Sequence, residues 1–294
     1  MKRRQFIRTS AAVSIAPVFT TSIWALAPDN KYRKDIGIQL YTLRNPIKED
    51  LQGTIKAVAQ AGYKQVEPYG FPNPQAVEMI KQAKDNGMAV NSSHFNWESV
   101  TNPDKKGVMP FSEVLDKAKE AGLQHLVIPY IHKHNRKNLD DYKRLAERCN
   151  QGAIEAKKAG IQLAYHNHAF EYEPKDGGKS GYQIFIEEFE PEMKFEVDVF
   201  WVKVGGVDPV KQIKALTGRV TQLHLKDLRK GVSLPSYGGV KPEDFKELGE
   251  GIIHMESVIV AADEAGVAHC HVEQDHSPDP MASVKTSMNY LKGL

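Results

Sequence analysis

Short apolar stretches alternate with amphipathic helical stretches along most of the chain. At six places a helical stretch ends in a small or polar residue followed by Gly, and an apolar stretch begins at once. Glycine just after the last helical residue takes the left-handed conformation that ends a helix. Each of these glycines therefore predicts a turn from a helix into a strand. The six are Gly62, Gly87, Gly122, Gly160, Gly218 and Gly266.

Adding two strands that lack this glycine gives eight predicted strands. Strands that alternate with helices form parallel βαβ units, and eight such units in a chain of this length favour a closed (β/α)8 TIM barrel of the α/β class. A doubly wound open sheet is the structural alternative, but no Gly-rich dinucleotide motif follows the first strand. Residues 228–250, rich in Gly, Pro and Ser, are predicted to form a long loop after the seventh strand. The predicted strands are 36–41, 64–68, 88–94, 124–130, 161–168, 194–199, 220–226 and 268–274.

Residues 1–27 are expected to be an export signal. Lys2-Arg3-Arg4 precedes a weakly apolar run over 11–24, and the small-x-small sequence Ala25-Leu26-Ala27 follows it. That order is typical of a twin-arginine secretory signal with cleavage after Ala27. A membrane anchor is the alternative, but the run falls short of the roughly 20 apolar residues that a span requires. We expect a single barrel domain over 28–294, exported to the periplasm, with no stable membrane insertion after cleavage.

Composition and charge narrow the class of partner. The formal net charge is only +2, and several basic residues belong to the predicted signal, so nucleic acid is not an expected partner. Cys149 and Cys270 are the only cysteines, so the fold must depend on its core rather than on a disulfide framework. A small molecule is the expected partner, and the sequence leaves open whether the chain forms a homo-oligomer.

Ionisable residues gather at the carboxyl ends of the predicted strands, where a barrel carries its active site. Such groups are costly to bury unless they are paired or bind a metal. Because residues two apart in a strand share a face, His166 and His168 should project together, and so should His224 and Lys226. The set comprises Glu67, His94, His166, His168, Asp198, His224, Lys226 and Glu273.

Four of these residues are candidate ligands of one divalent metal ion. Imidazole and carboxylate groups from strands 5 to 8 suit Mn²⁺, Zn²⁺, Co²⁺ or Mg²⁺. A single histidine at a strand end is more often a structural residue, but four successive strands that end in this way favour a functional site. The candidate ligands are His166, Asp198, His224 and Glu273.

Several segments, taken in order, resemble the sugar phosphate isomerase/epimerase family of the xylose isomerase-like TIM barrel superfamily. The resemblance spans essentially the whole chain after residue 27 and implies a metal-dependent enzyme of carbohydrate chemistry. In that superfamily, strands 5 to 8 contribute Glu, Asp, His and Glu to one metal, and the last three match Asp198, His224 and Glu273. The segments are 38–44 (IQLYTLR), 65–70 (QVEPYG), 165–172 (YHNHAFEY), 196–201 (EVDVFW), 224–227 (HLKD), 248–251 (LGEG) and 272–275 (VEQD).

The chain departs from that pattern at the first ligand. His166 stands where the ketose epimerases have a glutamate, which leaves His166, His168 or Glu171, in that order, as the fourth ligand. Those epimerases resemble enzymes with a two-base mechanism, in which one glutamate acts on each face of the substrate. The missing glutamate therefore argues against simple epimerisation. Trp201 replaces a metal-binding His of the related apurinic-site endonucleases, which argues against DNA repair.

The resemblance implies proton abstraction next to a carbonyl of a sugar or keto-sugar, with an enediolate stabilised by the metal. Glu273 or His168 is the expected base, and Lys226 is expected to neutralise the developing negative charge. Glu67 and His94 are expected to bind hydroxyls or relay protons, and Trp201 to form an apolar wall against a sugar ring. The expected substrate-binding residues are His94, Trp201, Tyr41 and Glu171.

The enediolate can react in two ways, and the sequence favours the two nearly equally. Reprotonation gives a sugar isomerase or epimerase, whereas loss of a β-substituent gives a lyase or dehydratase, for instance acting on a 3-keto-glycoside. Because the chain is expected to be exported and lacks a phosphate-binding Gly-rich loop, unphosphorylated sugars or glycosides are favoured. A sugar-binding barrel without catalysis is an alternative of another class, and the departure at His166 is its best support.

Overall fold

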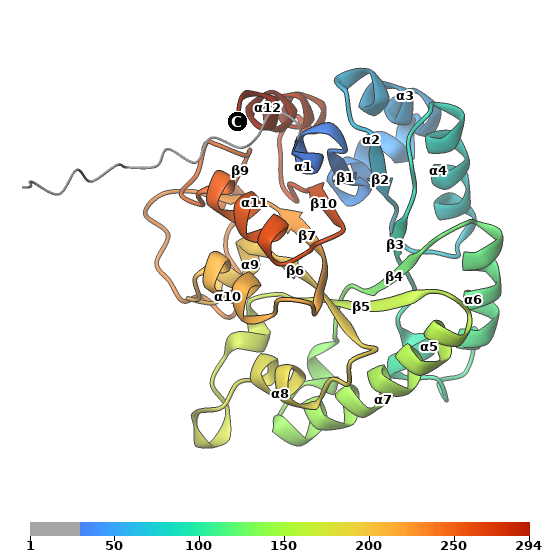
Figure 1. The fold of residues 1–294 in the computed structure, drawn as a ribbon, viewed down its shortest axis with the longest axis vertical. Helices are drawn as coiled ribbons and strands as arrows, with labels where there is room; N and C mark the ends of the chain where they lie inside the picture. The colour runs from blue at the N-terminus through green and yellow to red at the C-terminus, as the bar shows by residue number, and fades with distance from the viewer. Residues whose placement is uncertain (1–29) are drawn as a thin grey trace, which may run out of the picture.

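The structure, a computed structural model, describes residues 30–294, so the export signal predicted for residues 1–27 lies outside the described residues. Eight parallel strands form one sheet in the order β2-β1-β10-β7-β6-β5-β4-β3. Isolated bridges from Gln65 to Ala89 and from Phe71 to Phe95 join its two edges, which closes the sheet into a barrel. The strands lie in the middle of Figure 1 with the helices around them. The predicted TIM barrel is therefore confirmed.

Each barrel strand lies inside its predicted range but is shorter, and four of the strands end on the ionisable residues Glu67, His94, His166 and Asp198. The strands are β1 (Gly37–Gln39), β2 (Gln65–Glu67), β3 (Ser92–His94), β4 (His125–Ile128), β5 (Gln162–His166), β6 (Lys194–Asp198), β7 (Val220–Leu225) and β10 (His269–Val272). The predicted long loop is less irregular than expected. Within it β9 (Phe245–Lys246) pairs antiparallel with β8 (Asp227–Leu228).

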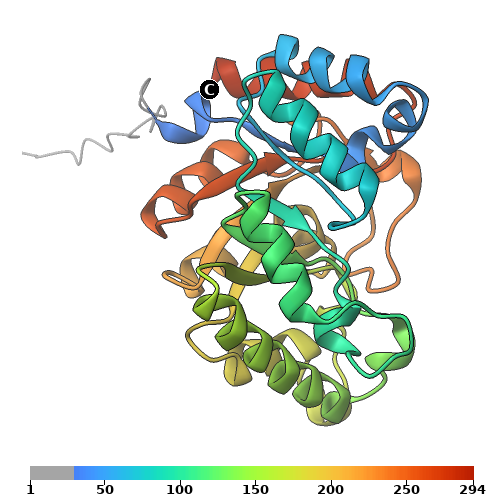
Figure 2. The ribbon, with the colours of Figure 1, turned by 90° about the vertical axis from the view of Figure 1, so that its right-hand side faces the viewer.

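Helices follow the strands around the outside of the barrel. All six predicted turn glycines have positive φ, from 71° at Gly122 to 109° at Gly62. In Figure 2 the last helix, α12, in red, lies beside α3, in blue, which brings the two ends of the barrel together. The helices are α1 (Lys31–Lys34), α2 (Arg44–Glu49), α3 (Leu51–Ala61), α4 (Pro74–Asp85), α5 (Glu98–Thr101), α6 (Phe111–Glu120), α7 (Leu139–Lys158), α8 (Gly181–Glu188), α9 (Val199–Val204), α10 (Pro209–Ala215), α11 (Met255–Glu264) and α12 (Pro280–Gly293).

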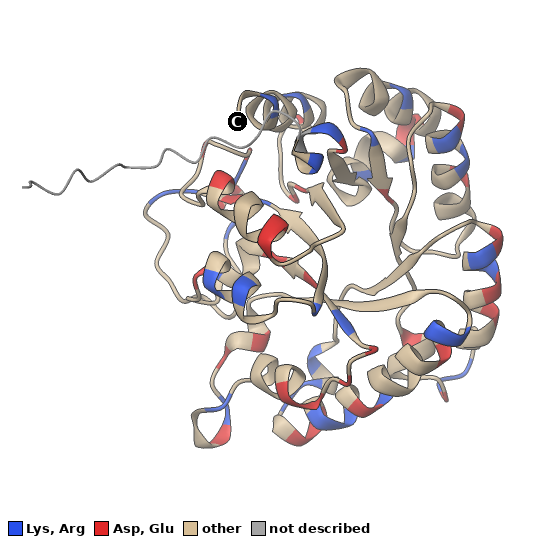
Figure 3. Cartoon of the chain, viewed as in Figure 1, with Lys and Arg blue, Asp and Glu red and all other residues tan. Residues whose placement is uncertain are grey.

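Apolar and polar residues separate on the two faces of the strands. The apolar core, which includes Val66, Leu163 and Leu223, packs between the barrel and its helices. Charged positions lie mostly on the outer helices and loops (Figure 3). Val, Ile and Leu usually fill the interior of a TIM barrel, but here the alternate strand residues inside it are polar. Fully buried interior residues are Gln39, Glu67, Ser92, Glu196, Gln222, His224 and His271.

Two further features concern residues 30–294 together: the absence of a membrane-spanning helix and the state of the cysteines. Within residues 30–294, no helix combines the length and the apolar character needed to cross a bilayer. Cys149 and Cys270 are both buried and free. The described part of the chain is therefore stabilised by packing and hydrogen bonds rather than by a disulfide.

Asp227 anchors the long segment that follows β7. Its carboxylate accepts hydrogen bonds from the backbone N–H groups of Gly249, Gly251 and Ile253 at 3.0–3.1 Å, and from that of Leu228 at 2.8 Å. A Cβ at Gly251 would lie 2.2 Å from Asp227 Oδ1, so only glycine lets the backbone approach this closely. The same segment carries residues 238–240 and Phe245, which line a pocket at the barrel mouth.

We expect Asp227→Ala to lower the free energy of unfolding by about 2–4 kcal/mol, because two buried and two partly buried N–H groups would lose their acceptor. Chemical denaturation of the variant and the wild-type protein measures this difference. The matched control is Asp116→Ala on the exposed face of α6, which should change stability by less than about 0.5 kcal/mol. Equal stability of the two variants would show that water replaces Asp227 without cost.

Candidate functional site

A pocket of about 830 Å³ opens at the carboxyl ends of the barrel strands. Ionisable side chains form its floor, and aromatic rings, among them Tyr69, Trp97, Tyr130 and Phe245, form its walls. Of the residues predicted from the sequence, those that line this pocket are Tyr41, His94, His166, His168, Trp201, Lys226 and Glu273. Five of the eight predicted strand-end residues thus meet at one opening, as parallel strands of a barrel favour.

Asp198 and His224 lie directly beneath this floor and are fully buried. Asp198 Oδ1 caps α9 by accepting hydrogen bonds from the backbone N–H groups of Phe200 and Trp201, at 2.9 and 3.0 Å. Asp198 Oδ2 is left to face Lys226 Nζ at 3.0 Å and His166 Nε2 at 3.7 Å. Only this second oxygen is available to a ligand.

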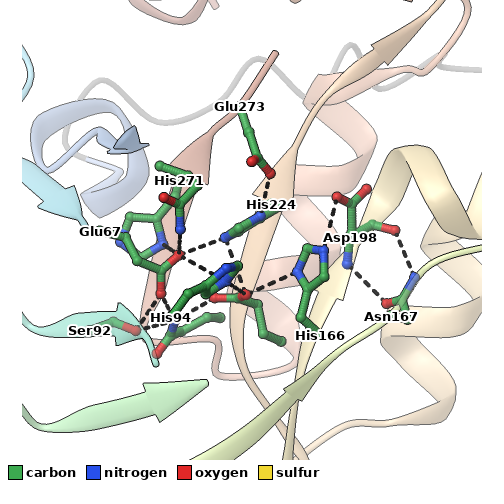
Figure 4. A network of polar contacts seen from close by, with 12 residues as sticks. Glu67, Ser92, His94, His166, Asn167, Asp198, His224, His271 and Glu273 are labelled. Carbon is green, nitrogen blue, oxygen red and sulfur yellow. Dashed lines mark hydrogen bonds and ion pairs between the residues drawn. The ribbon is translucent and has the colours of Figure 1, made fainter. Parts of the chain in front are cut away.

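Asp198, His224 and Glu273 offer ligand atoms that all lie within 4.8 Å of one another. His224 Nδ1 is 2.8 Å from Glu273 Oε2, and Figure 4 shows these side chains converging from neighbouring strands. His166 Nε2 approaches the same cluster from β5. Two carboxylates with one or two imidazoles suit the divalent ions expected from the sequence, so these residues fit such an ion. We name Asp198, His224, Glu273 and His166 Nε2 the outer cluster.

The ammonium group of Lys226 lies among three carboxylates of the floor. Lys226 Nζ is 3.0 Å from Asp198 Oδ2, 2.6 Å from Glu273 Oε2 and 2.9 Å from Asp275 Oδ2. Burial opposes its charge, but Asp198 and Asp275 outweigh burial and raise the pKa of Lys226 well above its usual range. Lys226 therefore stays charged and holds the same two oxygens that a divalent ion in the outer cluster would bind.

Two neighbouring carboxyl groups of the floor differ in protonation. Burial disfavours the charged form of Glu273, but Lys226 and His224 outweigh it and hold the pKa of Glu273 well below its usual range. Burial raises the pKa of Asp275 to about 7, although Lys226 opposes this shift. At neutral pH Glu273 is thus a carboxylate beside a partly protonated Asp275, which provides a base and an acid side by side.

Glu67 lies in the layer below the outer cluster and does not line the pocket. Its carboxylate accepts hydrogen bonds from Gln39 Nε2 at 2.9 Å, Gln222 Nε2 at 3.1 Å and Ser92 Oγ. His224 Nε2 lies 2.7 Å from Glu67 Oε2. Glu67 thus lies beneath the pocket in contact with His224, and its expected role in binding hydroxyls or relaying protons stays a prediction.

Glu196 belongs to the same layer, and the sequence analysis did not identify it. Glu196 Oε2 lies 2.8 Å from His94 Nε2, 3.0 Å from His166 Nδ1 and 3.2 Å from His224 Nε2. A signal was available, because Glu196 precedes Asp198 by two residues and therefore shares its face of β6. The same spacing relates Glu273 to His271 and Asp275, which were also missed.

The turn after β5 places His168 and Glu171 on different sides. His168 lies in the pocket, with its ring 5.2 Å from that of Phe170 and 5.3 Å from that of Trp201. Glu171 does not line the pocket, so the predicted role in substrate binding does not fit its position. The 3-10 turn η3 (Phe170–Tyr172) directs it inward, where it accepts hydrogen bonds from His168 N at 2.8 Å and Tyr165 Oη at 2.5 Å. Glu171 thus supports the turn that presents His168.

Tyr41 marks the rim of the pocket opposite this turn. Its side chain is 42% exposed, and its ring lies 5.5 Å from that of Tyr69. Arg44 stacks on Tyr41 and donates hydrogen bonds to the carbonyl oxygens of Tyr41 and Asp275. The guanidinium is therefore held at the rim, and Tyr41 remains accessible to a ligand.

Comparisons with known proteins agree with this architecture. Residues 55–294 match the family described as xylose isomerase-like TIM barrel. The chain is 25% identical over 263 residues to an inosose dehydratase of Clostridium perfringens, covering 81% of this chain and 88% of that protein. A sugar phosphate isomerase/epimerase from Parabacteroides distasonis ATCC 8503 has a TM-score of 0.71 at 24% identity, covering 87% and 97%. The IOLI protein, solved with a zinc atom, has a TM-score of 0.65 at 14% identity, covering 88% and 98%.

Glu171 should give the stability of the protein a measurable pH dependence. Burial raises the pKa of Glu171 to about 8 from an ordinary 4.5, so the folded state binds this proton more tightly than the unfolded state. The contribution of Glu171 to the free energy of unfolding is fully present below its ordinary pKa and is lost as pH rises towards about 8. In the wild-type protein the free energy of unfolding should therefore fall between pH 5 and 8, with Glu171 contributing a slope that approaches about 1.4 kcal/mol per pH unit. Glu171→Gln should remove this contribution, and urea denaturation measures it.

The control for this measurement is Glu155→Gln, at an exposed position of α7, which should keep the wild-type pH dependence. Because other groups also titrate, the informative quantity is the difference in slope between each variant and the wild-type protein. Identical slopes for Glu171→Gln and the wild-type protein would show that Glu171 is charged in the folded state.

Lys226→Met should tighten metal binding at the outer cluster. The substitution removes an ammonium that lies 2.6–3.0 Å from the two oxygens that an ion would need. At such distances we expect the affinity for Mn²⁺ or Zn²⁺ to rise by about tenfold or more. Isothermal titration calorimetry measures it, with Lys211→Met on the exposed surface of α10 as the control. Weaker binding by Lys226→Met would mean that Lys226 positions the carboxylates instead of competing for them.

Proposed function

Because this chain belongs to the xylose isomerase-like TIM barrel family, we propose that it is a metal-dependent enzyme of sugars or keto-sugars that abstracts a proton next to a carbonyl. The observation that carries the proposal is the Glu273 carboxylate. It lies on the pocket floor between Lys226 Nζ at 2.6 Å and His224 Nδ1 at 2.8 Å. The similar proteins named above include a sugar phosphate isomerase/epimerase and an inosose dehydratase, and proton abstraction next to a carbonyl is a step that these reactions can share.

The charges of the pocket favour an uncharged substrate. Lys226 shares its positive charge among three carboxylates, and Arg44 donates to two backbone carbonyls. Glu273 and Asp275 would repel a phosphate group at the floor. The aromatic walls, including Trp201, offer faces on which the C–H groups of a sugar can pack. An unphosphorylated sugar or glycoside fits this lining best.

The proposed place of action follows from residues 1–27. We infer that they direct export, so that the enzyme works in the periplasm. Phosphosugars are chiefly cytoplasmic, so this location agrees with the uncharged substrate that the pocket lining favours.

Four side chains have defined tasks in the proposed reaction. Glu273 takes the carbon-bound proton, and Lys226 donates a hydrogen bond to the oxygen on which negative charge develops. Asp198 and His224 hold Glu273 and Lys226 in place from below. A divalent ion bound by the outer cluster would supply Lewis acidity to the carbonyl oxygen.

Return of the proton to carbon would make the enzyme an isomerase or epimerase. His168 supports this outcome, because it is a second base in the same pocket. Burial, with His166 as the next cause, holds the pKa of His168 well below its usual range, so its imidazole is neutral. His168 Nδ1 is buried and has no hydrogen-bond partner among the described residues.

Elimination is the second candidate, and Asp275 is the observation that favours it. Glu273 would take the proton from one carbon, the bond from the neighbouring carbon to its leaving oxygen would break, and a double bond would form between the two carbons. Asp275, with a pKa of about 7, can give its proton to that leaving oxygen. The similarity to an inosose dehydratase supports this outcome for a keto-sugar or a 3-keto-glycoside.

The test is a screen of sugars and 3-keto-glycosides with metal-loaded protein in deuterium oxide. We expect deuterium at the carbon next to the carbonyl, detected by NMR and mass spectrometry, because the abstracted proton exchanges with solvent. A chelator should abolish the exchange, and Mn²⁺, Co²⁺ or Zn²⁺ should restore it. Product of unchanged composition identifies an isomerase or epimerase, and loss of a leaving group identifies a lyase.

Glu273→Gln should lower the exchange rate by about 10²–10⁴-fold, the usual contribution of a general base. Glu264→Gln on the exposed surface of α11 is the matched control and should keep the wild-type rate. Binding of sugars by metal-loaded protein without any exchange or change of product would contradict the proposal and identify a sugar-binding barrel.

A further inference from the structure

We propose a second divalent-cation site inside the barrel, beneath the outer cluster, formed by His94 Nε2, His166 Nδ1, His224 Nε2 and Glu196 Oε2. These four residues, which we name the inner cluster, offer ligand atoms within 4.8 Å of one another. They come from β3, β5, β7 and β6, and each is at most 8% exposed. The proposal concerns metal binding alone and does not depend on the reaction proposed above.

The inner cluster brings three imidazoles together around one carboxylate oxygen. Three imidazole nitrogens lie 2.8–3.2 Å from the single oxygen Glu196 Oε2. His94 and His166 form hydrogen bonds with this oxygen, whereas His224 Nε2 has its shorter contact, 2.7 Å, with Glu67 Oε2. The other oxygen of Glu196, Oε1, already accepts a hydrogen bond from Gln222 Nε2 at 2.6 Å. The oxygens of Glu67 already contact Gln39, Ser92, Gln222 and His224. The three nitrogens and Glu196 Oε2 are therefore the atoms of this layer that a cation could bind together.

A further unsatisfied imidazole, that of His271, lies beside Glu67. This imidazole is fully buried, yet neither of its ring nitrogens has a hydrogen-bond partner among the described residues. Its nearest charged contact is Glu67 Oε2, 3.8 Å from Nδ1. Figure 4 shows His271 directed into the same layer as Glu67, His94 and His224. A buried polar group without a partner is rare. His271 also forms a group with Glu67, Glu196 and His224 whose ligand atoms lie within 4.8 Å of one another, so it adds a further possible ligand to the layer of the inner cluster.

The spacing and chemistry of the inner cluster suit a small transition-metal ion. In a tetrahedral site with bonds of about 2.0–2.1 Å, neighbouring ligand atoms lie about 3.3 Å apart. The distances of 2.8–3.2 Å from Glu196 Oε2 to the three nitrogens need only a slight expansion to reach that value. Three imidazoles and one carboxylate favour Zn²⁺ or Co²⁺, whereas the carboxylate-rich outer cluster also suits Mn²⁺ and Mg²⁺.

His224 belongs to both clusters through opposite ring nitrogens. An outer ion would bind Nδ1 and leave Nε2–H to donate to Glu67, and an inner ion would bind Nε2 and leave Nδ1–H to donate to Glu273. A neutral imidazole has one nitrogen for a metal and one for a proton. The two sites are therefore alternatives, and an ion in the inner cluster occupies the His224 that the outer cluster requires.

The experiment compares crystals of the full protein soaked in Zn²⁺ with crystals soaked in Mn²⁺, using anomalous scattering. We expect the zinc peak among His94 Nε2, His166 Nδ1, His224 Nε2 and Glu196, and the manganese peak beside Asp198 and Glu273. A zinc peak only beside Asp198 and Glu273, or no zinc peak, overturns the proposal. This measurement uses the wild-type protein, so it does not depend on whether a variant folds.

Calorimetry of three variants gives an independent measure of zinc affinity. Glu196→Gln should lower it by at least about 100-fold, more than the loss of an outer-shell partner usually costs. Asp198→Asn should leave it within about threefold, because Asp198 belongs only to the outer cluster. Ser92→Ala, which removes a hydrogen bond to Glu67 but no ligand, is the control. A larger loss of zinc affinity in Asp198→Asn than in Glu196→Gln would overturn the proposal.

Discussion

Charge compensation inside the barrel is the constraint on which the rest of the site depends. The carboxylates of Glu67, Glu196, Asp198 and Glu273 are at most 4% exposed. Burying a single unpaired carboxylate costs several kcal/mol of desolvation free energy. Each of these four carboxylates must therefore face cations or several hydrogen-bond donors. His224 and Lys226 supply that compensation. Their charged forms are disfavoured by burial but stabilised by the surrounding carboxylates, which raise the pKa of both groups well above the usual range.

This constraint explains why the fold has two different interiors. The apolar core between strands and helices stabilises the barrel, and it leaves the inside of the barrel free to hold polar groups at low exposure. Neighbouring strands are joined by continuous parallel pairing from β3 round to β2, so the polar layers rest on a rigid wall. Rigid elements position a site more precisely than loops do. The loop segments that do contribute are themselves anchored, by Asp227 and by Glu171.

The same scaffold accommodates different reactions in its family, and residues at the strand exits distinguish them. In this chain His166 stands where the family resemblance places a glutamate, and its two nitrogens face Asp198 and Glu196. Having His166 in place of that glutamate removes a carboxylate from the pocket floor. It adds an imidazole that contacts Asp198 of the outer cluster and Glu196 of the inner cluster. Glu273, Asp275 and His168 are the groups of the pocket that the proposed reaction uses for proton transfer.

Local signals in the sequence determined the eight strands, the turn glycines and the polar strand exits, because periodicity and left-handed glycine conformations depend on neighbouring residues. The spacing of two residues also determined that His166 and His168, or His224 and Lys226, project together. Only the tertiary structure decided that Lys226 lies among three carboxylates, that Glu196 meets three imidazoles and that Glu171 turns away from the pocket. These outcomes depend on contacts across the barrel, such as Glu67 with His224, whose partners lie 157 residues apart in the chain.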